Sequence, residues 1–177
     1  QFLLAMPSMG DPRFLRSVVY MVAHDSEGAM GFIINRRAEG RSLGDILKDM
    51  PETVAKTGLV NLPVYVGGPV QNDRGFVLHT SDYEKTHNTL SQELPIALTQ
   101  SADVLVDAAH GRGPEKMRLF LGYAGWGPGQ IEGELQDNAW LVCDANIAEI
   151  FTSQGDDLYE KCLAAMGIDL ALLSSEG

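Results

Sequence analysis

The sequence predicts an α+β fold, in which helices pack around a mixed and largely antiparallel sheet. Three observations support this prediction. Short β-branched and apolar runs recur along the chain, segments with apolar residues at helical spacing lie between some of them, and the two kinds do not alternate as strict βαβ units. The length of 177 residues suits one domain, which we expect to span residues 1–177.

The N-terminal part of the chain predicts three strands. The first is Phe2–Met6, and the next two are the apolar runs Ser17–His24 and Ala29–Asn35. The turn residues of Asp25–Gly28 lie between these two runs and predict an antiparallel hairpin. Because both runs are apolar on nearly every residue, we expect the hairpin to be central and covered on both faces.

The remaining elements are predicted from similar short patterns. Further strands are expected at Leu62–Val66, Gly75–His79, Leu94–Leu98, Met117–Leu121 and Ala139–Val142. Helices are expected from a capping box at Ser42–Asp45 to Met50, from Ser101 to His110, around Ile131 and Leu135, and over Ala145–Phe151 and Asp157–Met166.

Charge and composition exclude several classes of function. The net charge is −11, and residues 61–177 hold seventeen acidic but only six basic side chains. A nucleic-acid-binding surface is basic, so we expect no direct binding to DNA or RNA. No apolar run approaches the ~20 residues that span a bilayer, so we expect no membrane association. The isolated Cys143 and Cys162 favour a reducing, cytoplasmic location and unreactive buried thiols.

The most unusual segment is Gly122–Gly129, which holds four glycines around Trp126. Glycine lets another backbone or a ligand approach closely. The spacing matches neither a dinucleotide fingerprint nor a P-loop. Two interpretations remain: a tight corner that packs Trp126 into the core or a partner, and a cradle of N–H groups for an anion. The carboxylates of Glu132 and Glu134 favour the first, because they would repel a phosphate.

The histidines offer an alternative, enzymatic hypothesis. His24 and His79 each end a predicted hairpin strand, so they could meet in space with Asn35 and Asp73. A hydrolase would then use His24 or His79, with Arg36 in the same cleft, for acid–base chemistry. Histidines that cap strand ends are more common, and we assign no catalytic residue. The histidines and cysteines lack metal-ligand spacing, and we expect neither a metal site nor a cofactor.

Long motifs in order also indicate a family. They are Leu4–Met9, Glu27–Gly31 with Ile34–Arg36, Val66–Val70, Arg74–His79, Leu121–Gly127, Asn138–Trp140 and Met166–Asp169. With these motifs the chain resembles the YqgE/AlgH family of small bacterial proteins; Arg37 departs from the pattern, where the family usually has proline. The resemblance implies a single cytoplasmic α+β domain. It implies no settled activity, although some members are labelled transcriptional regulators.

These observations favour a non-enzymatic binding or regulatory module that acts through a protein partner or a small ligand. The binding candidates are Asn35, Arg36, Gly67, Gly68, His79, Gly125, Trp126 and Gly127. The only close helix pair, Ala145–Phe151 and Asp157–Met166, is acidic and unlike a helix-turn-helix. We therefore expect any effect on transcription to run through a protein partner.

Overall fold

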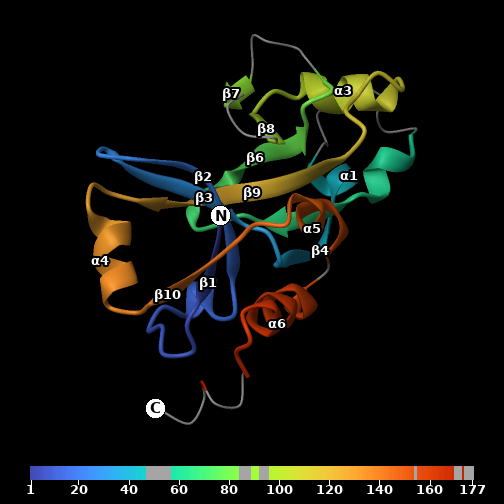
Figure 1. Ribbon diagram of the computed structural model, residues 1–177. Helices are drawn as coiled ribbons and strands as arrows, with labels where there is room; N and C mark the ends of the chain where they lie inside the picture. Colours follow the sequence, from blue (N-terminus) through green and yellow to red (C-terminus); the bar gives the residue numbers. More distant parts are fainter. Residues whose placement is uncertain (47–56, 84–88, 92–95, 154, 170–172, 174–177) are drawn as a thin grey trace.

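A curled mixed sheet with helices packed around it confirms the predicted fold class (Figure 1). The computed structural model describes residues 1–46, 57–83, 89–91, 96–153, 155–169 and 173. The strands follow the order β10-β1-β2-β3-β9-β6-β8-β7, and β4 and β5 join beside β9.

The predicted N-terminal hairpin is present. β2 (Val18–Asp25) and β3 (Gly28–Ile33) pair antiparallel, with β1 (Phe2–Ala5) and β10 (Trp140–Cys143) following β2 on its other side. Only part of the hairpin is covered, which corrects the expectation of burial on both faces. β2 is buried at its start and exposed from Ala23 onward, because β1 pairs with it only as far as Tyr20.

The other half of the sheet contains two strands that sequence patterns do not predict, β4 (Arg37–Ser42) and β7 (Thr89–Ser91). Its remaining strands are β5 (Pro63–Val66), β6 (Val70–Thr80), β8 (Ile96–Thr99) and β9 (Met117–Trp126). β5 pairs parallel with the first half of β9, while β6 pairs antiparallel along its other edge. The predicted residues 94 and 95 of β8 lie outside the described part of the chain.

Strand β9 crosses the molecule from the side that carries α3 to the side that carries α4 (Figure 1). The prediction that this strand ends at Leu121 is wrong, because β9 continues to Trp126. Gly122 has a φ of +66° and reverses the alternation of side chains along the strand. Phe120 faces the cluster under α5 and α6, whereas Ala124, also an even-numbered residue, faces the cluster under α4.

The helices and 3-10 turns are short. They are η1 (Pro12–Phe14), α1 (Leu43–Ile46), η2 (Gly58–Asn61), α3 (Asp103–Ala109), α4 (Gln130–Gln136), α5 (Ile147–Thr152) and α6 (Asp156–Ala165). One bond of the predicted capping box is present, since the backbone N–H of Ser42 donates to the Asp45 carboxylate at 2.7 Å. The rest of the helix predicted to reach Met50 lies outside the described residues.

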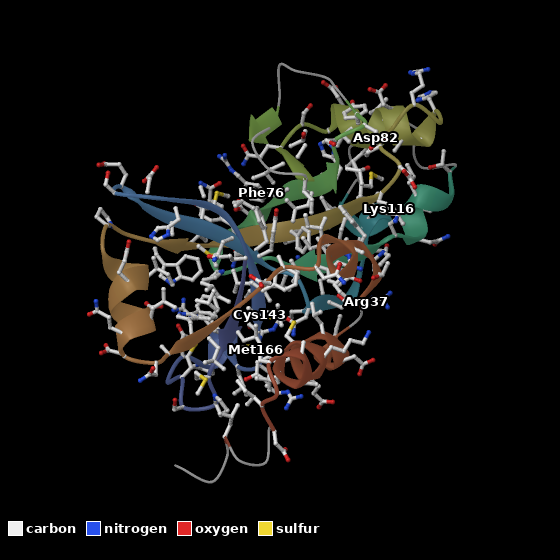
Figure 2. The ribbon with its side chains drawn as sticks, viewed as in Figure 1. Arg37, Phe76, Asp82, Lys116, Cys143 and Met166 are labelled. Carbon is white, nitrogen blue, oxygen red and sulfur yellow. The ribbon has the colours of Figure 1, made fainter. Side chains whose placement is uncertain are left out.

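Three buried clusters hold the layers together. Residues of α5 and α6 share one cluster with aromatic residues of the sheet, among them Phe76, which Figure 2 labels on β6. α4 covers the opposite face of β1, β2 and β3, and α3 covers a third cluster on β5, β6 and β9. In the described part of the chain, no helix is long and apolar enough to cross a membrane.

Candidate functional site

The two glycine motifs meet where two stretches of backbone cross. A Cβ built on Gly68 would lie 2.1 Å from the carbonyl carbon of Tyr123, and one on Gly67 would lie 2.3 Å from the carbonyl oxygen of Gly122. Real Cβ atoms do not approach backbone so closely, so both positions require glycine. The structure therefore brings the Gly67–Gly68 turn against β9, and a backbone crossing occupies the space between them.

Beyond this crossing, Glu134 of α4 joins the two tryptophans of the chain. Its Oε2 accepts the indole N–H of Trp126 at 2.9 Å and that of Trp140 at 2.7 Å. Its Oε1 accepts from the side-chain amide of Gln130 at 2.9 Å. Among the described residues no cation forms an ion pair with Glu134. All the hydrogen bonds that it accepts from the described residues come from neutral donors.

A third ring, Phe14, completes the aromatic group. It stacks near Trp126 with ring centroids 6.5 Å apart, and it meets Trp140 edge-on at 5.5 Å. The two rings of Trp126 and Trp140 are T-shaped to each other at 5.8 Å. Such geometries are favourable for aromatic pairs. The position of Phe14 depends on the loop between β1 and β2, which carries it.

The side chains of Asn35 and Arg36 hold that loop in place. The Asn35 side chain accepts from the backbone N–H of Val18 and donates to the carbonyl of Arg16, both at 2.9 Å. The Arg36 guanidinium donates to the carbonyl oxygens of Arg13 and Leu15. These two predicted site residues therefore fix the position of the segment that contains Phe14.

A cavity of about 360 Å³ opens beside the three rings, and we call it the tryptophan pocket. Its described lining residues are Met9, Gly10, Asp11, Arg13, Phe14, Pro69, Val70, Gly125, Trp126, Gln130, Glu134, Ala139 and Trp140. The Arg13 guanidinium forms an ion pair with Asp11 at 2.6 Å, so these two rim charges compensate each other. The charge on Glu134 remains without a compensating cation among the described lining residues.

Gly127 does not offer an open N–H for an anion. Its N–H donates to the side-chain oxygen of Gln130 at 3.0 Å, and Gln130 in turn donates to Glu134. A phosphate placed here would face that carboxylate. The geometry favours the interpretation of the glycine-rich segment as a corner that packs Trp126, which is 7% exposed.

The histidines have separate partners. His24 forms a 2.7 Å hydrogen bond with Glu132 on the surface, and this bond lowers the pKa of the Glu132 carboxyl. His79 is fully buried; its Nδ1 donates to the carbonyl of Thr80, and its Nε2 bonds the Thr99 hydroxyl, both at 2.9 Å. The described contacts of the two histidines share no residue and include neither Asn35 nor Arg36.

The cysteines are free, as two unpaired thiols. Cys143 lies on β10, close to α6 (Figure 2), and packs against the buried cluster that contains Cys162. Burial is the main reason that the pKa of the Cys162 thiol rises to about 12. This thiol is therefore protonated at neutral pH and a poor nucleophile.

The opposite end of β9 carries a buried cation, Arg118, which is 8% exposed. Its Nη2 donates to the carbonyl oxygens of Phe151 and Ser153, at 3.0 and 3.1 Å, where α5 ends. Its guanidinium carbon lies 4.1 Å from the centre of the Tyr65 ring. Desolvation lowers the pKa of Arg118. None of the carboxylates in the described residues forms an ion pair with it.

Sequence reasoning did not select Glu134, Trp140, Phe14 or Arg118 as site residues. Two signals were available. Arg118 is the one charged residue in the apolar run Met117–Leu121, and Trp126 and Trp140 are the only tryptophans of the chain. The Phe14 contact has no such signal, because it depends on a loop folding back across the sheet.

The comparisons with known proteins agree on one family. A family model described as AlgH-like matches residues 2–171. A UPF0301 protein of Rhodopseudomonas palustris is 45% identical, covering 99% of this chain and 84% of that protein, and one of Ruegeria pomeroyi is 42% identical, covering 99% and 95%.

Two solved structures share the fold. The solution structure of the AlgH protein from Pseudomonas aeruginosa superimposes with a TM-score of 0.82, at 42% identity, over 99% of this chain and 92% of that one. The crystal structure of protein DIP2367 from Corynebacterium diphtheriae has a TM-score of 0.72 at 23% identity, over 98% and 90%, and shows the fold alone.

Proposed function

The chain belongs to the AlgH-like family, and we propose that it is a non-catalytic binding module whose ligand places a positively charged group in the tryptophan pocket. One observation carries the proposal: the Glu134 carboxylate lies at the N–H edges of both indoles, in a cavity that Phe14 also lines, and receives only neutral donors from the described residues. A cationic ligand would supply the missing charge.

The chemistry of the pocket fits an ammonium or guanidinium group. A cation is attracted to the face of tryptophan or phenylalanine, and a nearby carboxylate adds to this attraction. A carboxylate offers about four acceptor positions, and the described donors occupy three of those on Glu134. The net charge of −11 also draws cations to the molecule and repels anions.

The lining also favours binding over catalysis. The described residues of the tryptophan pocket include no serine, cysteine, histidine or lysine, and its two carboxylates already have partners, Asp11 in the ion pair with Arg13 and Glu134 in the bonds from both indoles. Nothing in the described contacts of His24 and His79 favours the hydrolase alternative. Cytoplasmic action, with a lysine or arginine of a protein partner as the cation, is part of the proposal and is supported by the two free thiols.

Tryptophan fluorescence tests the proposal directly, because both tryptophans donate to Glu134 and the chain has no others. Titration with butylammonium chloride at constant ionic strength should change the emission saturably, with a midpoint in the millimolar range expected of so small a ligand. Uncharged 1-butanol at the same concentrations should leave the emission without a saturable change.

Two matched variants locate the binding. Glu134→Gln keeps an acceptor for the indoles but removes the charge, and it should abolish the response to butylammonium. Glu132→Gln removes a charge two residues away on the same helix, where the side chain bonds His24, and should keep the response. Equal loss in both variants, or an equal response to butanol, would contradict a cation site at Glu134.

A further inference from the structure

We propose that the cavity beside Arg118, at the opposite end of β9, is a second binding site, which takes a small carboxylate with an apolar tail. This inference is independent of the tryptophan pocket and of the function proposed for it. It rests on three features: the guanidinium, the cavity that it lines and the apolar character of the other lining residues.

Arg118 is a cation with an unused donor. Its hydrogen bonds to Ile34, Phe151 and Ser153 all leave from Nη1 and Nη2. Its Nε makes no hydrogen bond with any described residue, and a guanidinium has five N–H groups in a fixed plane. A buried charge is costly unless an opposite charge compensates it, and carbonyl dipoles and the Tyr65 ring offer only partial charges.

The cavity measures about 180 Å³. Pockets for drug-sized ligands span about 300–1,000 Å³, so this one suits a ligand of only a few heavy atoms. Apolar side chains dominate the rest of the lining, including those of Leu62, Leu105 and Phe151. Desolvation of the guanidinium, which lowers its pKa, strengthens its attraction for an anion inside such a cavity.

These features together select a class of ligand. A carboxylate accepts hydrogen bonds in the plane of a guanidinium, and a short hydrocarbon tail fits the apolar walls. Inorganic phosphate fits poorly, because it is strongly hydrated and carries no apolar part to bury. An uncharged alcohol with the same tail would leave the charge of Arg118 without a counter-ion.

The test observes Arg118 itself in the wild-type chain. Titration with sodium butanoate should move the Nε–H resonance of Arg118 in a ¹H–¹⁵N spectrum, saturably and with a midpoint in the millimolar range. Sodium phosphate and 1-butanol at equal concentrations should give no saturable movement. Failure of butanoate to move the resonance, or an equal effect of phosphate or butanol, would overturn the proposal.

A pair of variants shows whether the cavity is the site. Leu62→Trp places a large ring in the lining and should abolish the butanoate response while Arg118 keeps its bonds. Leu59→Trp is the control: Leu59 is also partly buried, but it lines only the adjoining cavity, which Leu62 lines as well, and is not among the described lining residues of the cavity beside Arg118. This variant should bind butanoate as the wild type does. Binding retained in Leu62→Trp, or lost equally in both folded variants, would overturn the assignment.

Discussion

Two opposite charges lie near the two ends of β9, Arg118 on the strand itself and Glu134 on α4, and neither forms an ion pair with a described residue. At the first end Arg118 is held by carbonyl oxygens and the face of Tyr65. Near the other end Glu134 is held by the N–H groups of Trp126, Trp140 and Gln130. The two charges lie on opposite sides of the molecule: Figure 2 labels Lys116, the residue before β9 begins, on the side away from α4.

The two halves of β9 direct their even-numbered side chains to different buried clusters. Arg118 and Phe120 face the cluster under α5 and α6, whereas Ala124 and Trp126 face the cluster under α4. The reversal at Gly122 separates the two halves, and the crossing with Gly67–Gly68 fixes it. Partial charges from neutral groups hold each ionised side chain in place, and in both proposals a ligand supplies the compensating charge.

Substitution at the crossing should produce the largest effect, because it would break the join between the two ends. Gly68→Ala would place a Cβ 2.1 Å from the backbone of Tyr123 and should cost at least about 3 kcal/mol, enough to deplete the folded state. Gly129→Ala is the control: its φ is +73° but its surroundings are open, so we expect a cost of about 1 kcal/mol. Urea unfolding measures both, and equal costs would contradict the role of the crossing.

Removal of Arg118 should produce the next largest effect. Arg118→Met keeps much of the side-chain volume but leaves the carbonyl groups of Phe151 and Ser153 without their donor. We expect the free energy of unfolding to fall by about 3 kcal/mol. An unchanged or higher urea midpoint would show instead that the cost of burying the cation outweighs its hydrogen bonds, and the account of this end would be wrong.

Glu134 should matter less for stability than Arg118, because it is only partly buried. Glu134→Leu leaves two indole N–H groups without their acceptor and should cost about 2 kcal/mol. Glu134→Gln retains an acceptor and should cost under about 1 kcal/mol. Urea midpoints of the two variants test this order, and a Gln variant as unstable as the Leu variant would show that the charge itself stabilises the fold.

The exposed pair of His24 and Glu132 should produce the smallest effect. The hydrogen bond from His24 lowers the pKa of the Glu132 carboxyl below its usual 4.5. Because the pKa of Glu132 is lower in the folded state, the hydrogen bond adds to the free energy of unfolding at pH values above 4.5. This added stability is lost as the pH falls through the pKa of the folded state. His24→Ala should therefore lower the urea midpoint slightly at about pH 6 and not at about pH 3; a difference that grows in acid would contradict this.

The sequence predicts much of the sheet but only part of the site. The hairpin of β2 and β3 follows from two apolar runs and a turn, because such patterns are local. The extension of β9 beyond Leu121 is missed, since glycines read locally as a loop and only the neighbouring Gly67–Gly68 backbone explains them. β4 is missed because Arg37–Ser42 has little apolar character and pairs only with β5.

The same limit applies to the site residues. Trp126 and Gly125 line the tryptophan pocket, while Asn35 and Arg36 hold the loop that bears Phe14. Whether any of them binds a ligand stays a prediction. His79 lies apart, bonded to Thr99. From the sequence alone Glu134 is a charge that repels anions, because its bonds to both indoles depend on how α4 folds back over the sheet.

One paired titration tests the central claim, that the two ends of β9 take ligands of opposite charge. ¹H–¹⁵N spectra of the wild-type chain would be recorded with butylammonium and, separately, with butanoate, at constant pH and ionic strength. We predict that butylammonium moves the indole N–H resonances of Trp126 and Trp140 and leaves Arg118 Nε unchanged, and that butanoate does the reverse. Movement of the same resonances by both ions, or saturable movement by neither, would contradict the claim.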